Sequence, residues 1–429
     1  MKVFPKNRSV SLALFQATFR KKCPFDEQMD ALCQTLESRD RAFVRLVVST
    51  TLRRLGEIDH VITHLLNKAL PRKLFTVHDI LRLGVSQILF LDIPPHAAVH
   101  SSVEIAKRGP FAPYSSLINA VLKRVATEGS HFLRPGQATH MNTPKWLWKN
   151  WRQSWGHEAT LAIAKMHEAT PPLDITLHPN QDPSFWMNAL DATLLPCGTL
   201  RRFTHGSVPD LPGFNDGVWW IQDAAASLPA RLFGKVQEKN ILDICAAPGG
   251  KTLQLSAAGA CVTSVDCSSS RLTRLADNLR RTGLHATLVQ ADAQTWRPLD
   301  QADGVLLDAP CTATGTIRRH PDTAHRKTPN DLCSLVSLQN QLLRSALTMV
   351  RPGGIIVYCT CSLQKEEGEA QIMTLLSETN TVVLDPITSE DIGNIPDVIT
   401  PEGYLRTMPY HLGNQGGMDG FFAARLRRL

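Results

Sequence analysis

The chain has 429 residues, of which 43% are hydrophobic and 20% are charged, and its net charge is +7. This length exceeds what one ordinary core can hold and predicts about two to four domains, of which we expect about three. The longest apolar runs, such as 88–91, fall far short of the roughly 20 residues that a membrane span needs, which argues against a membrane protein.

Ten cysteines occur at irregular spacing, without paired CxxC elements or a secretion signal. This pattern favours reduced thiols in a cytoplasmic protein over a disulfide framework. Cys359-Thr360-Cys361 is too closely spaced for a zinc site and lacks a second ligand pair, so we expect no metal.

The charge is unevenly distributed along the chain. Residues 1–130 hold 19 Lys+Arg against 11 Asp+Glu, a net charge of +8, whereas residues 131–429 hold 27 against 28, a net charge of −1. A basic module joined to a near-neutral remainder indicates that the first part contacts a polyanion. The alternative is a basic face that is merely solvated.

Residues 8 to about 127 have apolar positions at spacings of three and four, which predict a bundle of helices. Leu12, Phe15 and Phe19 begin this pattern, so a folded helix is favoured over a transit peptide. The segment resembles the NusB family of RNA-binding helical domains through Ile93-Pro94, Ala97-Ala98-Val99, 103–107 and 118–124. It departs from the NusB pattern at His100-Ser101-Ser102, in place of an acidic stretch, and at Ile118, in place of valine.

A shift to Gly, Pro, Thr and His at 130–144 predicts a linker. A small α+β segment follows, with a tryptophan-rich helix from Trp146, a strand at 173–177 and an end at Trp219-Trp220. The clustered tryptophans favour a core over a surface that stacks on bases. We therefore predict a helical domain at 1–130, a linker at 131–144, a middle domain at 145–230 and a C-terminal domain at 231–429.

In the C-terminal domain, strands alternate with helices, which predicts parallel βαβ units in a doubly wound α/β sheet. The predicted strands are 240–245, 262–266, 286–289, 304–308 and 354–358, with a closing hairpin that ends at 420–424.

Residues 241–252 predict a buried strand, a glycine turn and the start of a helix, an arrangement that binds nucleotide-like ligands at the carboxyl edge of a sheet. The segment has no GxGxxG motif and lacks the leading glycine of a P-loop, so neither phosphate cradle is indicated. Asp266 ends the second strand, and Asp292 follows the third. Together these features fit a ligand with ribose and adenine but no phosphates, namely S-adenosylmethionine.

Cys311 and Cys361 each follow one of two neighbouring buried strands. Carbon 5 of a pyrimidine can accept a methyl group once a thiolate has added to carbon 6, so paired thiols here indicate covalent catalysis. Asp308, three residues before Cys311, is placed to bind the pyrimidine near nitrogen 3. The alternative is that both cysteines are small core residues. Cations at 318–320 are expected to lower a thiol pKa or hold a phosphate.

Several motifs carry a family resemblance: Ala246-Ala247-Pro248-Gly249-Gly250-Lys251-Thr252, Asp308-Ala309-Pro310-Cys311, Thr314-Gly315, Thr360-Cys361-Ser362, His411 and Asp419-Gly420-Phe421-Phe422. Through them the chain resembles the RNA (cytosine-5) methyltransferases of the RsmB (Sun/Fmu) type, which act on 16S ribosomal RNA. The resemblance covers nearly the whole chain. It implies an all-α NusB-like domain, a small α+β middle domain and a Rossmann-like methyltransferase domain.

The resemblance also implies roles for individual residues. Cys361 is the implied nucleophile, and Cys311 the implied aid to breakdown of the covalent adduct. DNA cytosine methyltransferases use the Pro-Cys thiol instead, so chemistry alone leaves the order open, and Cys359 is a third candidate. The implied S-adenosylmethionine site comprises Cys245, Ala246, Ala247, Pro248, Gly249, Gly250, Lys251, Asp266, Asp292 and Asp308.

We therefore expect a monomeric cytoplasmic enzyme that methylates a cytosine in 16S ribosomal RNA and has no membrane partner. The same chemistry on a transfer RNA is an alternative. A non-catalytic NusB-like RNA-binding factor would explain the basic N-terminus, and a nicotinamide-dependent oxidoreductase would share the sheet and Asp266.

Overall fold

The computed structural model describes residues 6–134, 136–204 and 206–429. The chain divides into two compact units, the first formed by Met1–Ala169 with Arg319–Lys327, and the second by Thr170–Arg318 with Thr328–Leu429. Residues 1–5 of the predicted helical domain, residue 135 of the predicted linker and residue 205 of the predicted middle domain lie outside the described residues.

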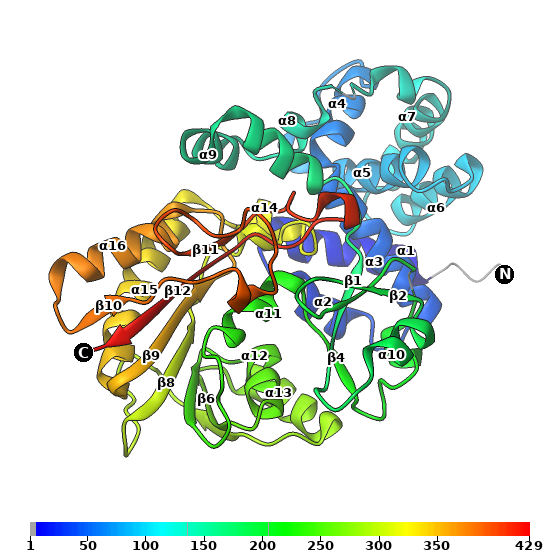
Figure 1. Cartoon of the computed structure of the whole chain (residues 1–429). Helices are drawn as coiled ribbons and strands as arrows, with labels where there is room; N and C mark the ends of the chain where they lie inside the picture. The colour runs from blue at the N-terminus through cyan, green and yellow to red at the C-terminus, as the bar shows by residue number, and fades with distance from the viewer. Residues whose placement is uncertain (1–5, 135, 205) are drawn as a thin grey trace. The chain divides into compact units, whose positions relative to one another are not determined.

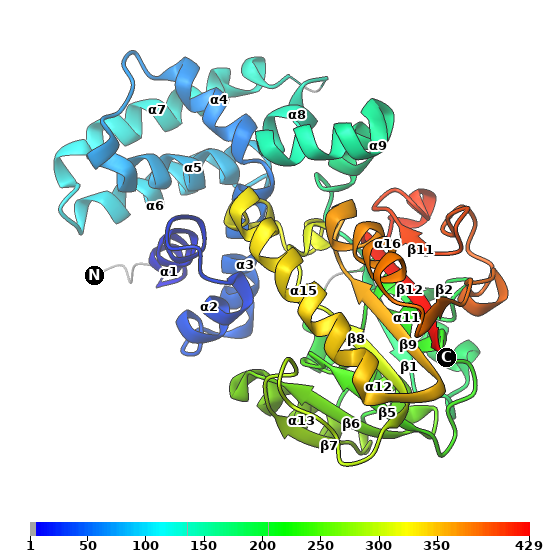
Figure 2. The same cartoon turned by 90° about the vertical axis from the view of Figure 1, so that its left-hand side faces the viewer.

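The first unit is helical, as predicted, and we call it the helical unit. Each helix buries one apolar stripe; in α3, for example, Val44, Val47, Val48 and Leu52 are all buried at helical spacing. Figure 2 shows α4 to α7 side by side. The helices of the unit are α1 (Lys6–Phe15), α2 (Phe25–Leu32), α3 (Ser38–Arg53), α4 (Leu55–Leu65), α5 (Phe75–Leu89), α6 (Pro95–Lys107), α7 (Ser115–Glu128), α8 (Ala138–Asn142), α9 (Lys145–Met166) and α14 (Asp322–Arg326).

Helix α14 comes from far along the chain but packs inside the helical unit. The Asp322 carboxylate accepts a hydrogen bond from the Phe25 backbone N–H at 3.3 Å, and Lys22 Nζ donates to the His325 carbonyl at 2.7 Å. His325 Nε2 lies 2.8 Å from the Leu52 carbonyl oxygen. Residues 319–327 are therefore part of the helical unit, where α14 contacts α2 and α3.

The second unit contains a small antiparallel sheet in the order β2-β3-β1-β4. Its core is formed by Ile175, Trp186, Leu190, Leu200 and Trp219. The predicted strand at 173–177 is confirmed as β1. The elements of this part are β1 (Leu173–Leu177), α10 (Pro183–Ala189), β2 (Ala192–Leu194), β3 (Leu200–Arg202) and β4 (Trp219–Ile221).

The larger sheet has the order β10-β12-β9-β8-β5-β6-β7, and β11 pairs with β12. Strands β5 to β9 are parallel, and β12 runs antiparallel to β9, β10 and β11. The predicted doubly wound sheet and its closing hairpin are confirmed, and β10 was not predicted. The strands are β5 (Asn240–Ile244), β6 (Cys261–Asp266), β7 (Thr287–Gln290), β8 (Ala302–Asp308), β9 (Val350–Thr360), β10 (Val382–Leu384), β11 (Leu405–Thr407) and β12 (Phe421–Arg428).

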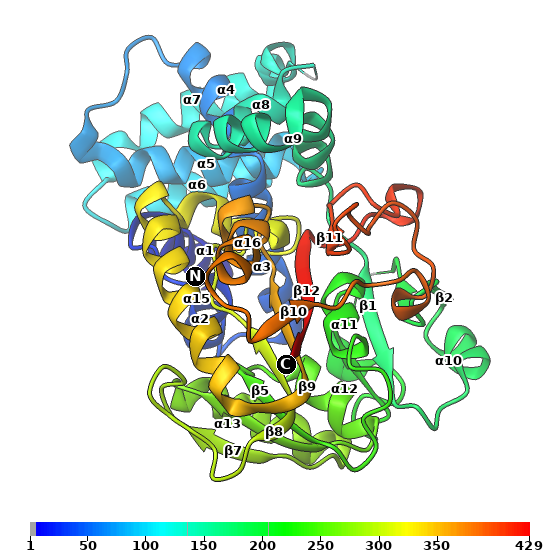
Figure 3. The same cartoon turned by 60° about the vertical axis from the view of Figure 1, so that its left-hand side comes forward.

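Helices cover both faces of this sheet (Figures 1 and 3). One face packs on α11 (Ala224–Arg231) and α12 (Gly250–Ala257), and α13 (Ser269–Thr282) packs beside α12. The other face packs on α15 (Pro329–Met349) and α16 (Glu369–Glu378). Burial on both faces explains why the central strands are continuous apolar runs. Because β5, β6, β8 and β9 are parallel, the polar loops that follow them gather at one edge of the sheet.

No helix among the described residues is long and apolar enough to cross a membrane.

Candidate active site

The loop between β5 and α12 forms a tight turn at the carboxyl edge of the sheet. Cys245 has a φ of 61° and Gly249 a φ of 106°, both in the left-handed region. Gly249 precedes α12, and a side chain there would overlap Leu275, so this close approach requires glycine. The turn leaves the first N–H groups of α12 directed at the sheet edge, where they can bind a polar ligand.

Two predicted carboxylates flank this turn. Asp266, at the end of β6, is buried and accepts hydrogen bonds from Ala247 N at 3.3 Å and Ser268 N at 2.9 Å. The exposed Arg271 side chain also donates to Asp266 at 2.9 Å. Asp292 is exposed and accepts from Gln294 N at 2.9 Å, which closes the turn after β7. Asp266 is thus fixed against the glycine turn, whereas Asp292 is exposed to solvent.

Lys251 and Asp308 form an ion pair that joins the glycine turn to the end of β8. Lys251 Nζ lies 2.8 Å from Asp308 Oδ2 and 4.9 Å from the centre of the Phe421 ring. Burial by itself lowers the pKa of Lys251, but the negative charge of Asp308 outweighs it and raises this pKa. Lys251 therefore remains charged although its side chain is almost wholly buried.

The Sγ atoms of Cys311 and Cys361 lie 3.5 Å apart. The separation exceeds a disulfide bond of about 2.05 Å and corresponds to a thiol contact. Both side chains are half-buried, and they follow the adjacent strands β8 and β9. The hydrogen bond with Cys361, followed by burial, raises the pKa of Cys311. The structure thus brings the two predicted thiols together and keeps Cys311 protonated, so that it can donate to Cys361.

The other cysteines near this edge are poor nucleophiles. Cys359 is fully buried and its Sγ lies 3.6 Å from Asp308 Oδ1. Burial and the adjacent charge of Asp308 raise its pKa well above the ordinary range. Burial, with Asp266, likewise raises the pKa of Cys245. Both side chains remain thiols at neutral pH.

Of the cations predicted at 318–320 to act on a thiol or a phosphate, Arg318 and His320 pair with carboxylates. Arg318 is buried, with its guanidinium 2.8 Å from Asp223 Oδ2 and 3.0 Å from Asp419 Oδ1. His320 Nδ1 belongs to the helical unit and lies 3.2 Å from Asp26 Oδ2. The positive charge of Arg318 is therefore neutralised by aspartates rather than offered to a thiolate or a phosphate.

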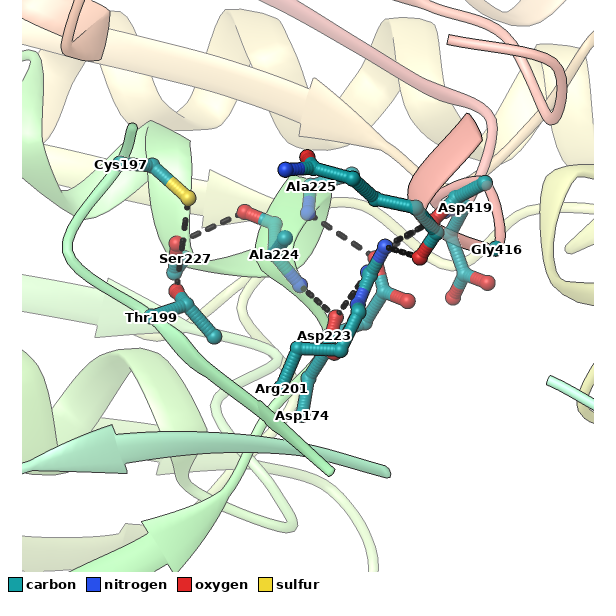
Figure 4. A network of polar contacts seen from close by, with 12 residues as sticks. Asp174, Cys197, Thr199, Arg201, Asp223, Ala224, Ala225, Ser227, Gly416 and Asp419 are labelled. Atoms are coloured by element: carbon teal, nitrogen blue, oxygen red, sulfur yellow. Dashed lines mark hydrogen bonds and ion pairs between the residues drawn. The ribbon is translucent and has the colours of Figure 1, made fainter. Parts of the chain in front are cut away.

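Arg318 pairs with Asp223 and Asp419, two members of a larger buried network that Figure 4 shows. Arg201 on β3 forms a bidentate pair with Asp174 on β1, with both distances 2.7 Å. Asp223 Oδ1 accepts hydrogen bonds from Ala225 N at 2.9 Å and from Asp419 N at 3.0 Å. These contacts fasten the small sheet to the loop before β12.

The same loop supports the turn beside Cys361. Gly420 N donates to the Gly315 carbonyl at 2.9 Å, and Gly315 N donates to the Cys361 carbonyl at 3.0 Å. A side chain on Gly315 would overlap the Gly420 backbone, which explains the glycine in Thr314-Gly315. Backbone hydrogen bonds thus connect this network, through Gly420 and Gly315, to Cys361.

One residue beside the thiols was missed from the sequence. Glu367, in the 3-10 turn Lys365–Glu367, is fully buried and accepts hydrogen bonds from the residues that follow both cysteines. Its only signal in the sequence is its place six residues after Cys361, which does not indicate a contact with Thr312.

Known proteins resemble this chain along most of its length. The family model described as 16S rRNA methyltransferase RsmB/F matches residues 231–427, and the NusB family model matches residues 6–127. Ribosomal RNA small subunit methyltransferase B of Klebsiella pneumoniae is 33% identical over 422 residues, covering 93% of this chain and 96% of that protein. The protein of the same name from Escherichia coli K12 is 33% identical over 399 residues, covering 87% and 91%.

Solved structures share the fold. The crystal structure of PH0851 covers 100% of both chains with a TM-score of 0.80 and 21% identity. A methyltransferase homolog from Pyrococcus horikoshii covers 69% of this chain and 100% of its own, with a TM-score of 0.56 and 26% identity. NSun6 from the same organism, solved with SFG, has a TM-score of 0.58, 20% identity and coverage of 66% and 98%.

These matches confirm the predicted resemblance, fold class and enzyme class. They do not support the non-catalytic RNA-binding factor or the nicotinamide-dependent oxidoreductase. The chain belongs to the RsmB/F family of 16S rRNA methyltransferases and carries a NusB-family domain at its N-terminus.

Proposed function

We propose that the protein methylates carbon 5 of a cytosine in 16S ribosomal RNA, with Cys361 as nucleophile and Cys311 as the residue that helps to break down the adduct. The observation that carries this proposal is the 3.5 Å contact between the two thiols, at the sheet edge where Asp308 joins the glycine turn. The relatives' name supplies the ribosomal substrate.

The residues at the glycine turn fit S-adenosylmethionine, which supplies an electrophilic methyl group. The turn from Cys245 to Lys251 has free helix N–H groups but no phosphate-binding sequence. Asp266 and Asp292 follow the next two strands, where carboxylates accept hydrogen bonds from ribose and base. The exposed Arg271 side chain can move away from Asp266 to release one of its oxygens. We propose that these residues, with Asp308, hold the cofactor.

The thiol residues then perform the covalent steps. The Cys361 thiolate adds to carbon 6 of the cytosine, and the ring electrons move toward carbon 5 and nitrogen 3. Asp308 contacts the ring near nitrogen 3 and orients it. Once carbon 5 carries the methyl group, a base takes its proton, the electrons of that C–H bond re-form the double bond between carbons 5 and 6, and the Cys361 thiolate leaves carbon 6. Cys311, in contact with Cys361, assists this last step. A cytosine in a helix must leave its stack to reach the site.

Bisulfite sequencing of total RNA from cells with and without the gene tests the substrate. We expect one or more unconverted cytosines in 16S ribosomal RNA that disappear when the gene is deleted. Loss of a transfer RNA site instead would support the alternative substrate, and no change in any RNA would overturn the proposal. Titration calorimetry with S-adenosylmethionine tests the cofactor separately.

A further inference from the structure

Glu367 is a buried carboxylate that the mechanism above does not use. Its side chain is fully buried behind the two cysteines, and its backbone carbonyl accepts a hydrogen bond from Tyr358 Oη at 2.8 Å. Tyr358 lies on β9, three residues before Cys361. The turn that carries Glu367 is therefore fixed to the same strand that positions Cys361.

Both oxygens of Glu367 accept hydrogen bonds from residues that follow a cysteine. Thr312, next to Cys311, donates its backbone N–H to Oε1 at 2.8 Å and its hydroxyl to Oε2. Ser362, next to Cys361, donates its hydroxyl to Oε2 at 2.5 Å. One carboxylate thus joins two loops that lie about 50 residues apart in the sequence.

A fourth hydrogen bond extends this contact to the other side of Cys311. The Gln339 side chain on α15 donates to Glu367 Oε1 at 2.9 Å and to the Pro310 carbonyl at 2.9 Å. Cys311 therefore lies between two neighbours, Pro310 and Thr312, that are both held through Gln339 and Glu367. All four donors to Glu367 are uncharged, and an ionised carboxylate, which only accepts hydrogen bonds, satisfies them all.

We propose that Glu367 is a positioning residue that holds Cys311 and Cys361 in contact, so that one thiol attacks the pyrimidine while the other remains beside it. This inference rests on the proposed function. Loss of the carboxylate leaves buried hydroxyl donors without an acceptor and releases both loops. A displacement of about 1 Å at a reacting atom costs on the order of 10²-fold in rate.

The charge of Glu367 also favours a division of labour between the thiols. The hydrogen bond with Cys361 and burial raise the pKa of Cys311 most, and the nearby negative charge of Glu367 raises it further, because a buried negative charge disfavours a second one close by. Cys311 therefore stays a neutral thiol, which can donate a hydrogen bond to the Cys361 thiolate.

The test compares Glu367→Gln with Glu378→Gln in the full-length protein. Glutamine keeps the shape of the side chain but replaces one acceptor oxygen by an NH₂ group. This group is itself a donor, so it cannot accept hydrogen bonds from the donors around it. Glu378 is an exposed residue at the end of α16 that pairs with the exposed Arg344, so its variant controls for loss of a charge.

The measurements are kcat, KM, cofactor affinity and the rate of covalent adduct formation with RNA that contains 5-fluorocytosine, whose carbon 5 cannot lose a proton. For Glu367→Gln we expect kcat and the adduct rate to fall by about 10²-fold, with KM and cofactor affinity within about threefold. The Glu378→Gln protein should match the wild type in every measurement.

An adduct rate for Glu367→Gln equal to that of the wild type would overturn the inference, even if the variant unfolds at a lower temperature. If the variant does not fold, Thr312→Val decides, because it removes one donor with little change in shape. We expect its adduct rate to fall by roughly tenfold, and an unchanged rate would overturn the inference. Absence of any adduct with the wild type would instead overturn the proposed covalent mechanism.

Discussion

The two halves of the candidate active site are built in different ways. The proposed cofactor half is centred on one short segment, residues 245–251, which is shaped by left-handed backbone at Cys245 and Gly249 and joined to Asp308 by a charged pair. The thiol half comes from separate segments that carry Cys311, Gln339, Cys361 and Glu367, and uncharged donors on one buried carboxylate join them. A turn encoded within one segment thus lies beside a pair of thiols that come together only when β8 and β9 are paired.

The largest effect expected in the thiol half is that of Cys361→Ala. The variant removes the proposed nucleophile, so methyl transfer should fall by at least about 10⁴-fold while cofactor affinity stays unchanged. The measurement is transfer of a radioactive methyl group from S-adenosylmethionine to 16S ribosomal RNA. Cys333→Ala, at an exposed cysteine on α15, is the matched control and should be fully active. Full activity of the Cys361→Ala protein would remove Cys361 from the nucleophile position.

Cys311→Ala should give a different phenotype in the same half. If Cys311 assists breakdown of the adduct, its loss slows release after the first turnover, and a covalent protein–RNA complex accumulates. Denaturing electrophoresis of the reaction with unmodified RNA measures this complex. We expect a slower band for Cys311→Ala and none for Cys361→Ala or the double variant. Without such a band, the role of Cys311 in adduct breakdown is untenable.

The different construction of the two halves also explains what was predictable from the sequence. Five strands of the large sheet and the glycine turn were predicted because apolar runs and glycines are local signals. The proximity of Cys311 and Cys361 was predictable because each follows such a strand. Glu367 was not, since its contact with Thr312 crosses 55 positions and depends on the register of β8 against β9.

Two other features of the fold were missed for related reasons. The residues after Cys311 were interpreted as a basic loop of the sheet, yet α14 contacts α2 and α3, and sequence periodicity does not indicate such a tertiary contact. Arg318 read as a free cation, because its buried partners Asp223 and Asp419 lie about 100 positions away on either side. In both cases a local pattern was overridden by contacts between distant segments.

In the cofactor half, Gly249→Ala tests whether the glycine turn depends on the backbone conformation of Gly249 and on its close approach to Leu275. The alanine must keep a φ of 106° and displace Leu275, so we expect a loss of about 2 kcal/mol in unfolding free energy and about tenfold weaker cofactor binding. Gly353→Ala is the matched control, because Gly353 also has a positive φ of 78° but open space around it. It should lose about 1 kcal/mol and bind the cofactor normally. Calorimetry and urea unfolding measure both, and equal behaviour of the two variants would contradict the close approach at Gly249.

A pH-dependent effect is expected on the stability of the strand beneath the cofactor turn. Asp243 on β5 is fully buried, and burial raises its pKa to about 7, although Thr252 Oγ1 donates to its carboxylate at 2.6 Å. Between pH 4 and pH 7 the folded protein therefore binds a proton that the unfolded chain has released, so unfolding free energy falls as pH rises through this window. Asp243→Asn cannot titrate. Thermal unfolding of both proteins at pH 5 to 8 measures this dependence. The unfolding free energy of the wild type minus that of Asp243→Asn should decline by at most about 1.4 kcal/mol per pH unit up to pH 7 and then level off. If unfolding free energy has the same pH dependence in the two proteins, Asp243 titrates in its ordinary range. A titrating buried carboxylate would then not distinguish the cofactor half from the thiol half.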